Sequence, residues 1–80
     1  MSGFLTAEEV IKKVQAGEVL EYELLSELDF SNANLQGALF KDVTLDKINF
    51  DNTNLRNVKF EHTVFNRVNM SNVDFEGDTP

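Results

Sequence analysis

The chain has 80 residues, 41% of them hydrophobic, a formal net charge of −7 and no cysteine. This length predicts one small domain with a modest core, and the missing cysteines exclude disulfide bonds and thiolate chemistry. No clustered Lys and Arg, no membrane-length apolar run and no signal-peptide pattern occur, so we expect a cytoplasmic protein that binds neither nucleic acid nor a membrane directly.

Residues 7–16 predict a short amphipathic helix. Its apolar residues recur at helical spacing, at Val10, Ile11 and Val14. Thr6 and Glu9 have the spacing of a capping box, and Gly17 provides a stop.

The next segment, 18–27, is ambiguous. Leu20 and Leu25 are five residues apart, which is the spacing found throughout the rest of the chain. The residues two positions before them are Glu18 and Glu23, where later units have smaller side chains, most of them apolar. We therefore expect an irregular first half-coil here.

From residue 28 to residue 77 a five-residue pattern repeats without a break. A large apolar residue occurs in each unit, at Phe30, Leu35, Phe40, Leu45, Phe50, Leu55, Phe60, Phe65, Met70 and Phe75. A smaller apolar residue, Ala or Thr lies two positions earlier, at Leu28, Ala33, Ala38, Val43, Ile48, Thr53, Val58, Thr63, Val68 and Val73. This period fits neither an α-helix nor a plain strand, because both would scatter these residues over every face.

A chain that turns every five residues satisfies the pattern. Two inward residues separated by one outward residue form a minimal strand, and the remaining two residues form a corner. The predicted corner residues are Asn32, Gly37, Asp42, Lys47, Asn52, Asn57, His62, Arg67, Asn72 and Gly77. Four corners close a square coil, and successive coils stack about 4.8 Å apart. The fold class is thus an all-β solenoid of about three coils, with the helix at 7–16 capping the first coil.

The units Leu-Asp-Phe-Ser-Asn at 28–32 and Ala-Asn-Leu-Gln-Gly at 33–37 resemble the A(D/N)LXX repeats of pentapeptide-repeat proteins. The resemblance covers ten consecutive units and implies a right-handed quadrilateral β-helix. We divide the single domain into a capping helix and half-coil at 1–27, the β-helix at 28–77 and a tail at 78–80.

Stacking residues twenty apart predicts the outer sides of the coils. Asn32, Asn52 and Asn72 would form a side-chain amide ladder at one corner. Lys41 would lie over Glu61 as an exposed ion pair.

Two adjoining sides carry most of the cations of the repeat and two outward apolar residues. We expect a lateral contact surface there, made of Leu39, Lys59, Val64 and Arg67.

No catalytic, cofactor-binding or metal site is expected. His62 is the single histidine and occupies a predicted corner, and the carboxylates are spread over outward positions without an apolar pocket to raise a pKa. A core filled by Phe and Leu leaves no room for a cofactor. We expect no enzyme activity.

The last coil is predicted to be open, because only five residues follow Phe75. The apolar residues of this end are Phe60, Phe65, Met70 and Phe75. Its unpaired backbone would be a template for another coil. We therefore expect a noncatalytic protein-interaction module of the bacterial accessory or adaptor type. It would form a homodimer through this end, or dock it on a protein of unknown identity.

The alternative implied by the resemblance is a modulator of DNA gyrase, a type II topoisomerase, that imitates DNA. That role calls for a long and strongly acidic rod, whereas three coils extend over only about 14 Å. A truncated or minimal repeat scaffold without a partner of its own is a third possibility.

Overall fold

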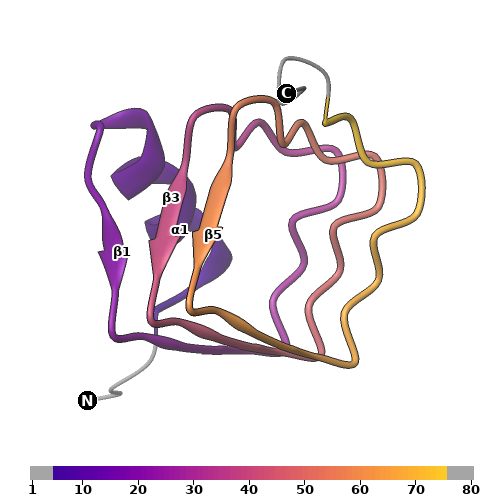
Figure 1. Ribbon diagram of the computed structural model, residues 1–80. Coiled ribbons are helices and arrows are strands. Elements are labelled where there is room, and N and C mark those ends of the chain that lie inside the picture. Colours follow the sequence, from indigo (N-terminus) through magenta and orange to yellow (C-terminus); the bar gives the residue numbers. More distant parts are fainter. Residues whose placement is uncertain (1–4, 76–80) are drawn as a thin grey trace.

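The computed structural model describes residues 5–75. Within them, one helix precedes six short strands, α1(Ala7–Gln15), β1(Leu20–Glu21), β2(Leu24–Ser26), β3(Leu39–Lys41), β4(Thr44–Asp46), β5(Lys59–Glu61) and β6(Val64–Asn66). The strands form two parallel sheets with the orders β1-β3-β5 and β2-β4-β6. Figure 1 shows the coils stacked one behind the next, with α1 at the end where the chain begins.

Every pairing between coils joins residues twenty positions apart. In the first sheet Leu20 pairs with Phe40 and Phe40 with Phe60. The two sides without named strands are joined by isolated bridges, such as those from Asn49 to Asp29 and Asn69. A four-sided coil of twenty residues follows, which confirms the predicted all-β solenoid.

The corners lie where the sequence predicted them. Every predicted corner within the described residues has a positive φ: Asn32, Gly37, Asp42, Lys47, Asn52, Asn57, His62, Arg67 and Asn72. The left-handed region is costly for Lys47, His62 and Arg67, because each has a Cβ. A backbone bond to the next coil offsets part of this cost, as in the 2.9 Å bond that Lys47 N donates to Asn66 O.

The first half-coil is more regular than we expected. Leu20 and Leu25 are fully buried, and β1 and β2 pair in register with β3 and β4. Tyr22 and Glu27 have positive φ and form corners like the later ones. One large inward side chain on each side is sufficient here, because α1 covers this end of the core.

The helix begins and ends close to the predicted residues. Thr6 Oγ1 accepts a bond from Glu9 N at 3.1 Å, and Glu9 Oε1 accepts one from Thr6 N at 2.8 Å, which confirms the capping box. Val10 and Val14 are buried against the first coil. Among the residues from 5 to 75, no helix is long and apolar enough to cross a membrane.

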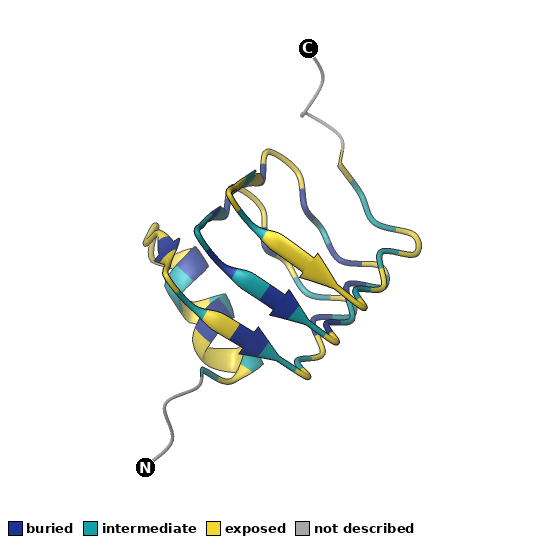
Figure 2. Cartoon of the chain, turned by 60° about the horizontal axis from the view of Figure 1, so that its bottom comes forward, coloured by how far each residue is buried: buried dark blue, intermediate teal, exposed yellow. Residues whose placement is uncertain are grey.

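The core is a column of stacked inward side chains. Phe30 and Phe50 lie nearly parallel, with ring centroids 5.5 Å apart, and Phe40 and Phe60 stack at 5.1 Å. Thr53 is fully buried and satisfies its hydroxyl by donating to Phe30 O at 2.7 Å. Figure 2 shows that burial falls along the stack: β2 and β4 have buried centres, whereas β6 is exposed along its whole length.

Candidate interaction surfaces

The inward residues of the last described coil form the terminal face, which we define as Phe60, Phe65, Met70 and Phe75. Phe65 and Phe75 are 43% and 42% exposed, and Phe60 and Met70 are partly buried. The matching residues of the preceding coil, Phe40, Leu45, Phe50 and Leu55, are fully buried. Since both sets occupy the same position in the repeat, the difference in exposure arises from the missing cover of a following coil among the described residues.

The backbone of the last described coil has fewer pairing partners within residues 5–75 than the earlier coils have. In earlier coils each corner amide donates to a carbonyl of the next coil, as Asp42 N does to Glu61 O at 2.9 Å. Among the described residues no such acceptor follows His62, Arg67 or Asn72. Within residues 5–75, β5 and β6 are therefore the last strands of their sheets.

The residues of the predicted lateral surface lie on two adjoining sides of the coils, as the twenty-residue register predicted. Leu39 pairs with Lys59 in the first sheet, and Leu39 is partly buried. Val64 belongs to β6 and is 56% exposed. Arg67 donates to Asp46 Oδ1 at 3.0 Å, so its charge is already used within the chain. These residues are spread over the sides and form no enclosed site.

Three exposed apolar residues in the first half-coil were not predicted from the sequence: Val19, Tyr22 and Leu24. Val19 precedes Leu39 by one coil length, and Leu24 pairs with Thr44 in register. Extending the five-residue register to this segment would have placed all three outside the core.

The predicted ladder of Asn32, Asn52 and Asn72 side chains is wrong. Asn32 and Asn52 bridge coils through their backbone amides, which donate to Asp51 O at 3.0 Å and Ser71 O at 3.1 Å. The side chain of Asn72 donates instead to Asp51 Oδ1 at 3.1 Å.

The amide ladders lie instead at the outward position just before the large inward residue. Asn49 Nδ2 donates to Asp29 Oδ1 at 3.3 Å, and Asn69 Nδ2 donates to Asn49 Oδ1 at 3.0 Å. In each residue Oδ1 also accepts the backbone amide two residues later, as Asn49 Oδ1 does from Asp51 N at 2.9 Å. This local turn fixes the side chain with its amide directed at the preceding coil.

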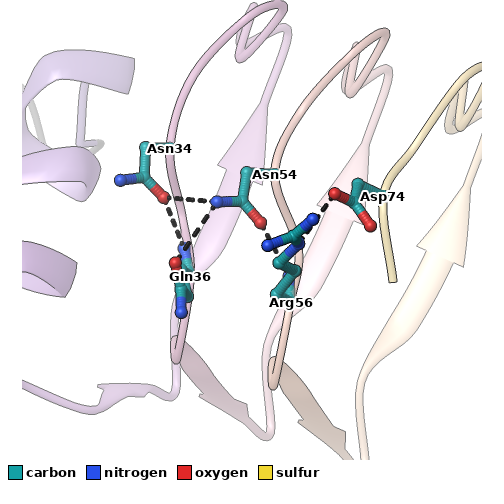
Figure 3. A network of polar contacts seen from close by, with 5 residues as sticks. All are labelled: Asn34, Gln36, Asn54, Arg56 and Asp74. Atoms are coloured by element: carbon teal, nitrogen blue, oxygen red, sulfur yellow. Dashed lines mark hydrogen bonds and ion pairs between the residues drawn. The ribbon is translucent and has the colours of Figure 1, made fainter. Parts of the chain in front are cut away.

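A second ladder on the next side continues into an ion pair. Figure 3 shows Asn54 Nδ2 donating to Asn34 Oδ1 at 3.0 Å and, at 3.4 Å, to Gln36 Oε1. Arg56 Nε donates to Asp74 Oδ2 at 2.8 Å. Polar groups on this side are therefore largely used in stacking the coils.

The expected ion pair between Lys41 and Glu61 also changes partner. The two residues are opposite each other in β3 and β5, as predicted. Lys41 Nζ lies 4.0 Å from Glu21 Oε2, on the preceding coil, and that is its ion pair among the described residues. Register fixed which residues are neighbours, but a flexible lysine can reach either coil.

Asp29, at the start of the first ladder, has a lowered pKa. Hydrogen bonds from the side chain and backbone of Ser31 stabilise its charged form, and the Asn49 amide adds to them, so the pKa lies below the ordinary 3.8. A lowered folded-state pKa gives stability that is present above the unfolded value and lost as the pH falls through the folded value.

We expect Asp29→Asn to flatten the acid limb of the stability curve, because Asn keeps the acceptor but does not titrate. Below pH 3.8, the free energy of unfolding should fall less steeply in the variant than in the wild type. Urea titrations from neutral pH to below this value measure the difference. Parallel curves would contradict the role assigned to Asp29.

Chemistry-bearing groups are sparse. His62 Nδ1 lies 3.8 Å from Asp42 Oδ1 on an exposed corner. Within residues 5–75 there is no group of three potential metal ligands and no pocket. The expectation that the chain lacks enzyme activity stays a prediction.

A four-sided solenoid with two inward residues in every five defines the class of repeat protein to which this chain belongs. The chain is a member of the pentapeptide-repeat family: the family model described as pentapeptide repeats (9 copies) matches residues 40–80. Members of this family are typically noncatalytic repeat proteins and commonly serve as protein-interaction modules. Comparisons with curated proteins and with solved structures returned no match.

Proposed function

We propose that the protein is a noncatalytic interaction module that docks another polypeptide on its terminal face. The observation that carries the proposal is the exposure of Phe65 and Phe75, 43% and 42%, at positions whose equivalents one coil earlier are fully buried. A docked polypeptide would remove this apolar surface from water, which is favourable by about 25 cal/mol per Å².

The edges of β5 and β6 support the same proposal. A polypeptide that adds a strand to a sheet edge gains backbone hydrogen bonds, and the alternate side chains provide specificity. Among the described residues, the terminal face combines an apolar centre with the last strand of a sheet on two of its sides. As part of the proposal, we place the module among small accessory or adaptor proteins of the bacterial cytoplasm, on the basis of family membership alone.

Phe65→Asp tests the docking surface. We expect this variant to lose association because a charge would have to be buried without a partner. Val64→Asp is the matched control, since Val64 is the preceding residue of β6 and lies on the outer side. Sedimentation velocity over a range of concentrations measures self-association, and thermal unfolding checks that both variants fold.

If the wild type is monomeric, the same two variants are compared as immobilised baits. A protein captured by the wild type and by Val64→Asp, but not by Phe65→Asp, would support docking through the terminal face. Equal capture by all three chains would overturn it.

The described surface gives little support to the DNA-like alternative. Lys47 pairs with Glu27 at 3.8 Å and Arg67 with Asp46 at 3.0 Å, so part of the acidity is neutralised on the sides of the coils. A supercoiling assay with purified gyrase separates the two functions. Inhibition at stoichiometric protein would favour the alternative.

A further inference from the structure

We propose that the outer face of the β2-β4-β6 sheet binds an amphipathic α-helix of a partner protein, with the basic edge of that helix against the corner at Tyr22. The surface is defined by three outward residues, one from each coil, and we call it the side column: Leu24, Thr44 and Val64. It is distinct from the terminal face, so the inference does not rest on the docking function proposed above.

The side column is continuous across the three coils. Leu24 pairs with Thr44 and Thr44 with Val64 in the register of the sheet, whose strands lie side by side in Figure 2. Leu24 is 45% exposed and Val64 is 56% exposed, with the partly buried Thr44 between them. Two aliphatic side chains and a methyl-bearing one therefore form a line along the outside of the stack.

Two other sides of the coils have polar side chains at the same position, and these bind one another. On one side Asn49 bonds to Asp29 and Asn69. On the next side Asn54 bonds to Asn34. Within residues 5–75 the side column forms no side-chain hydrogen bonds, so it presents apolar groups where those sides have an amide ladder.

The two flanks of the side column differ in charge. The corner flank lies between the column and the β1-β3-β5 sheet and has three parts: 21–23, 41–43 and 61–63. The opposite flank also has three parts: 26–27, 46–47 and 66–67. With His62 neutral, the corner flank has four carboxylates and one lysine, a net charge of −3, whereas the opposite flank has two acids and two bases.

Ion pairing leaves this difference in place. On the opposite flank each base has an acidic partner within the chain. On the corner flank Lys41 lies 4.0 Å from Glu21, whereas Glu23 and Glu61 have no ion pair among the described residues. Uncompensated negative charge therefore borders the apolar column on one flank, and it attracts a basic group of a partner to that flank.

Tyr22 adds an aromatic surface to the corner flank. It is the single tyrosine, it is 76% exposed, and its backbone amide donates to Lys41 O at 3.1 Å, which ties the corner to the next coil. An exposed ring between Glu21 and Glu23 in the sequence favours a Lys or Arg side chain through the cation–π interaction. A second copy of this chain would bring the same negative flank, so the charges favour a basic partner of another kind.

The dimensions of the side column favour a helix that lies along the stack. The column extends over two coil spacings, about 9.6 Å. Helix residues i and i+7 are about 10.5 Å apart, with i+3 or i+4 between them on the same face. Three apolar residues of a helix would thus meet the three residues of the column in order. Same-face residues of a strand are about 6.7 Å apart, which does not match the coil spacing of about 4.8 Å.

A designed peptide tests the proposal. The probe is a synthetic amphipathic helix of roughly 18 residues, long enough at 1.5 Å per residue to extend past the column, with Leu at i, i+4 and i+7 and Lys along one edge. Its matched control has Glu in place of each Lys. In NMR titrations of the labelled protein, we expect the lysine peptide to shift the backbone amide signals of Tyr22, Leu24 and Thr44, and the glutamate peptide to leave them unchanged.

Leu24→Thr/Val64→Thr tests the apolar part of the site. These changes give all three coils the residue that the middle coil already has, at exposed positions where the fold should be retained. We expect the dissociation constant of the lysine peptide to rise about tenfold, because less apolar area is buried on binding. Val19→Thr is the matched control, since Val19 is 46% exposed and precedes an inward residue on the neighbouring side. It should leave the constant unchanged.

Asp42→Asn/Glu61→Gln tests the charge. The pair of changes removes two of the four carboxylates of the corner flank, and Asn occupies other corners of this chain at positive φ. We expect binding of the lysine peptide to weaken by about threefold or more at low ionic strength. The difference from the wild type should disappear in 1 M salt, where the Debye length is about 3 Å.

The outcomes separate this site from the terminal face. Phe65→Asp should bind the lysine peptide as the wild type does, and in the capture experiment a protein held by the side column would be lost from Val64→Asp instead. Failure of the lysine peptide to bind, equal binding of the two peptides, or shifts confined to the terminal face would overturn the proposal. An unchanged dissociation constant in Leu24→Thr/Val64→Thr or in Asp42→Asn/Glu61→Gln at low ionic strength would also overturn it.

Discussion

Replacing Phe50 with alanine is expected to lower the free energy of unfolding by about 3–5 kcal/mol. Phe50 is fully buried in the middle coil, and its ring stacks on Phe30 with centroids 5.5 Å apart. The cavity would lie between coils whose spacing is fixed by backbone hydrogen bonds, so it could collapse only slightly. Small proteins are stable by only about 5–15 kcal/mol, so a large part of the total would be lost. Urea denaturation followed by circular dichroism measures the change.

Phe65→Ala is the matched control, because it makes the same truncation at an inward position that is 43% exposed. It should cost about half as much or less, since less apolar area returns to water. The comparison is made at concentrations where the chain is monomeric. Equal costs for the two variants under those conditions would contradict an open terminal face.

The sequence alone predicted the fold and its register from residue 28 onward, because one five-residue period carried the information. Phe40, Leu45, Phe50 and Leu55 are each fully buried as expected, and the pairing register follows from the same spacing. Even Lys47, which has no intrinsic preference for the left-handed region, was placed at a corner by its position. In a repeat protein the same pattern recurs in many units, so an unusual residue in one unit has little effect on the prediction of the fold.

What the sequence could not supply depended on side-chain geometry. A spacing of twenty residues predicts that Asn32 and Asn52 are neighbours, and it predicts the same for Asn49 and Asn69. The structure shows that Asn69 and Asn49 bridge coils through their side chains, with Asn49 Oδ1 also accepting from Asp51 N, whereas Asn32 and Asn52 do so through their backbone amides. Likewise, Lys41 has an acid on each neighbouring coil, and register alone cannot choose between them.

For the interaction surfaces, too, the sequence predicted the positions of the residues but not their exposure. The period identified Phe65 and Phe75 as inward residues at the end of the stack, and the structure adds how much of each is exposed. The exposed Tyr22, at 76%, was missed because Glu18 and Glu23 obscured the repeat in the first half-coil. The regular repeat was therefore predicted to begin at residue 28, two units later than the pairing of Leu20 and Leu25 shows.

Val10→Asp is expected to uncap the other end of the stack. Val10 is fully buried where α1 packs on β1 and the first coil, so a carboxylate there would be desolvated without a partner. We expect a loss of about 3 kcal/mol or more in the free energy of unfolding. The helix has nine residues and cannot persist in water without its packing, so its far-ultraviolet circular dichroism signal should be lost first.

Gln15→Asp is the matched control, because it introduces the same charge into α1 at an exposed position. Gln15 is exposed in the last turn of α1, where an acid opposes the helix dipole at a cost of about 0.3–1 kcal/mol. If Val10→Asp costs no more than this control, α1 is not a cap and the first coil closes without it. If the expected difference is found, Leu20 and Leu25 depend on the helix for their burial. The helix would then close one end of the stack, whereas Phe65 and Phe75 at the other described end are partly exposed.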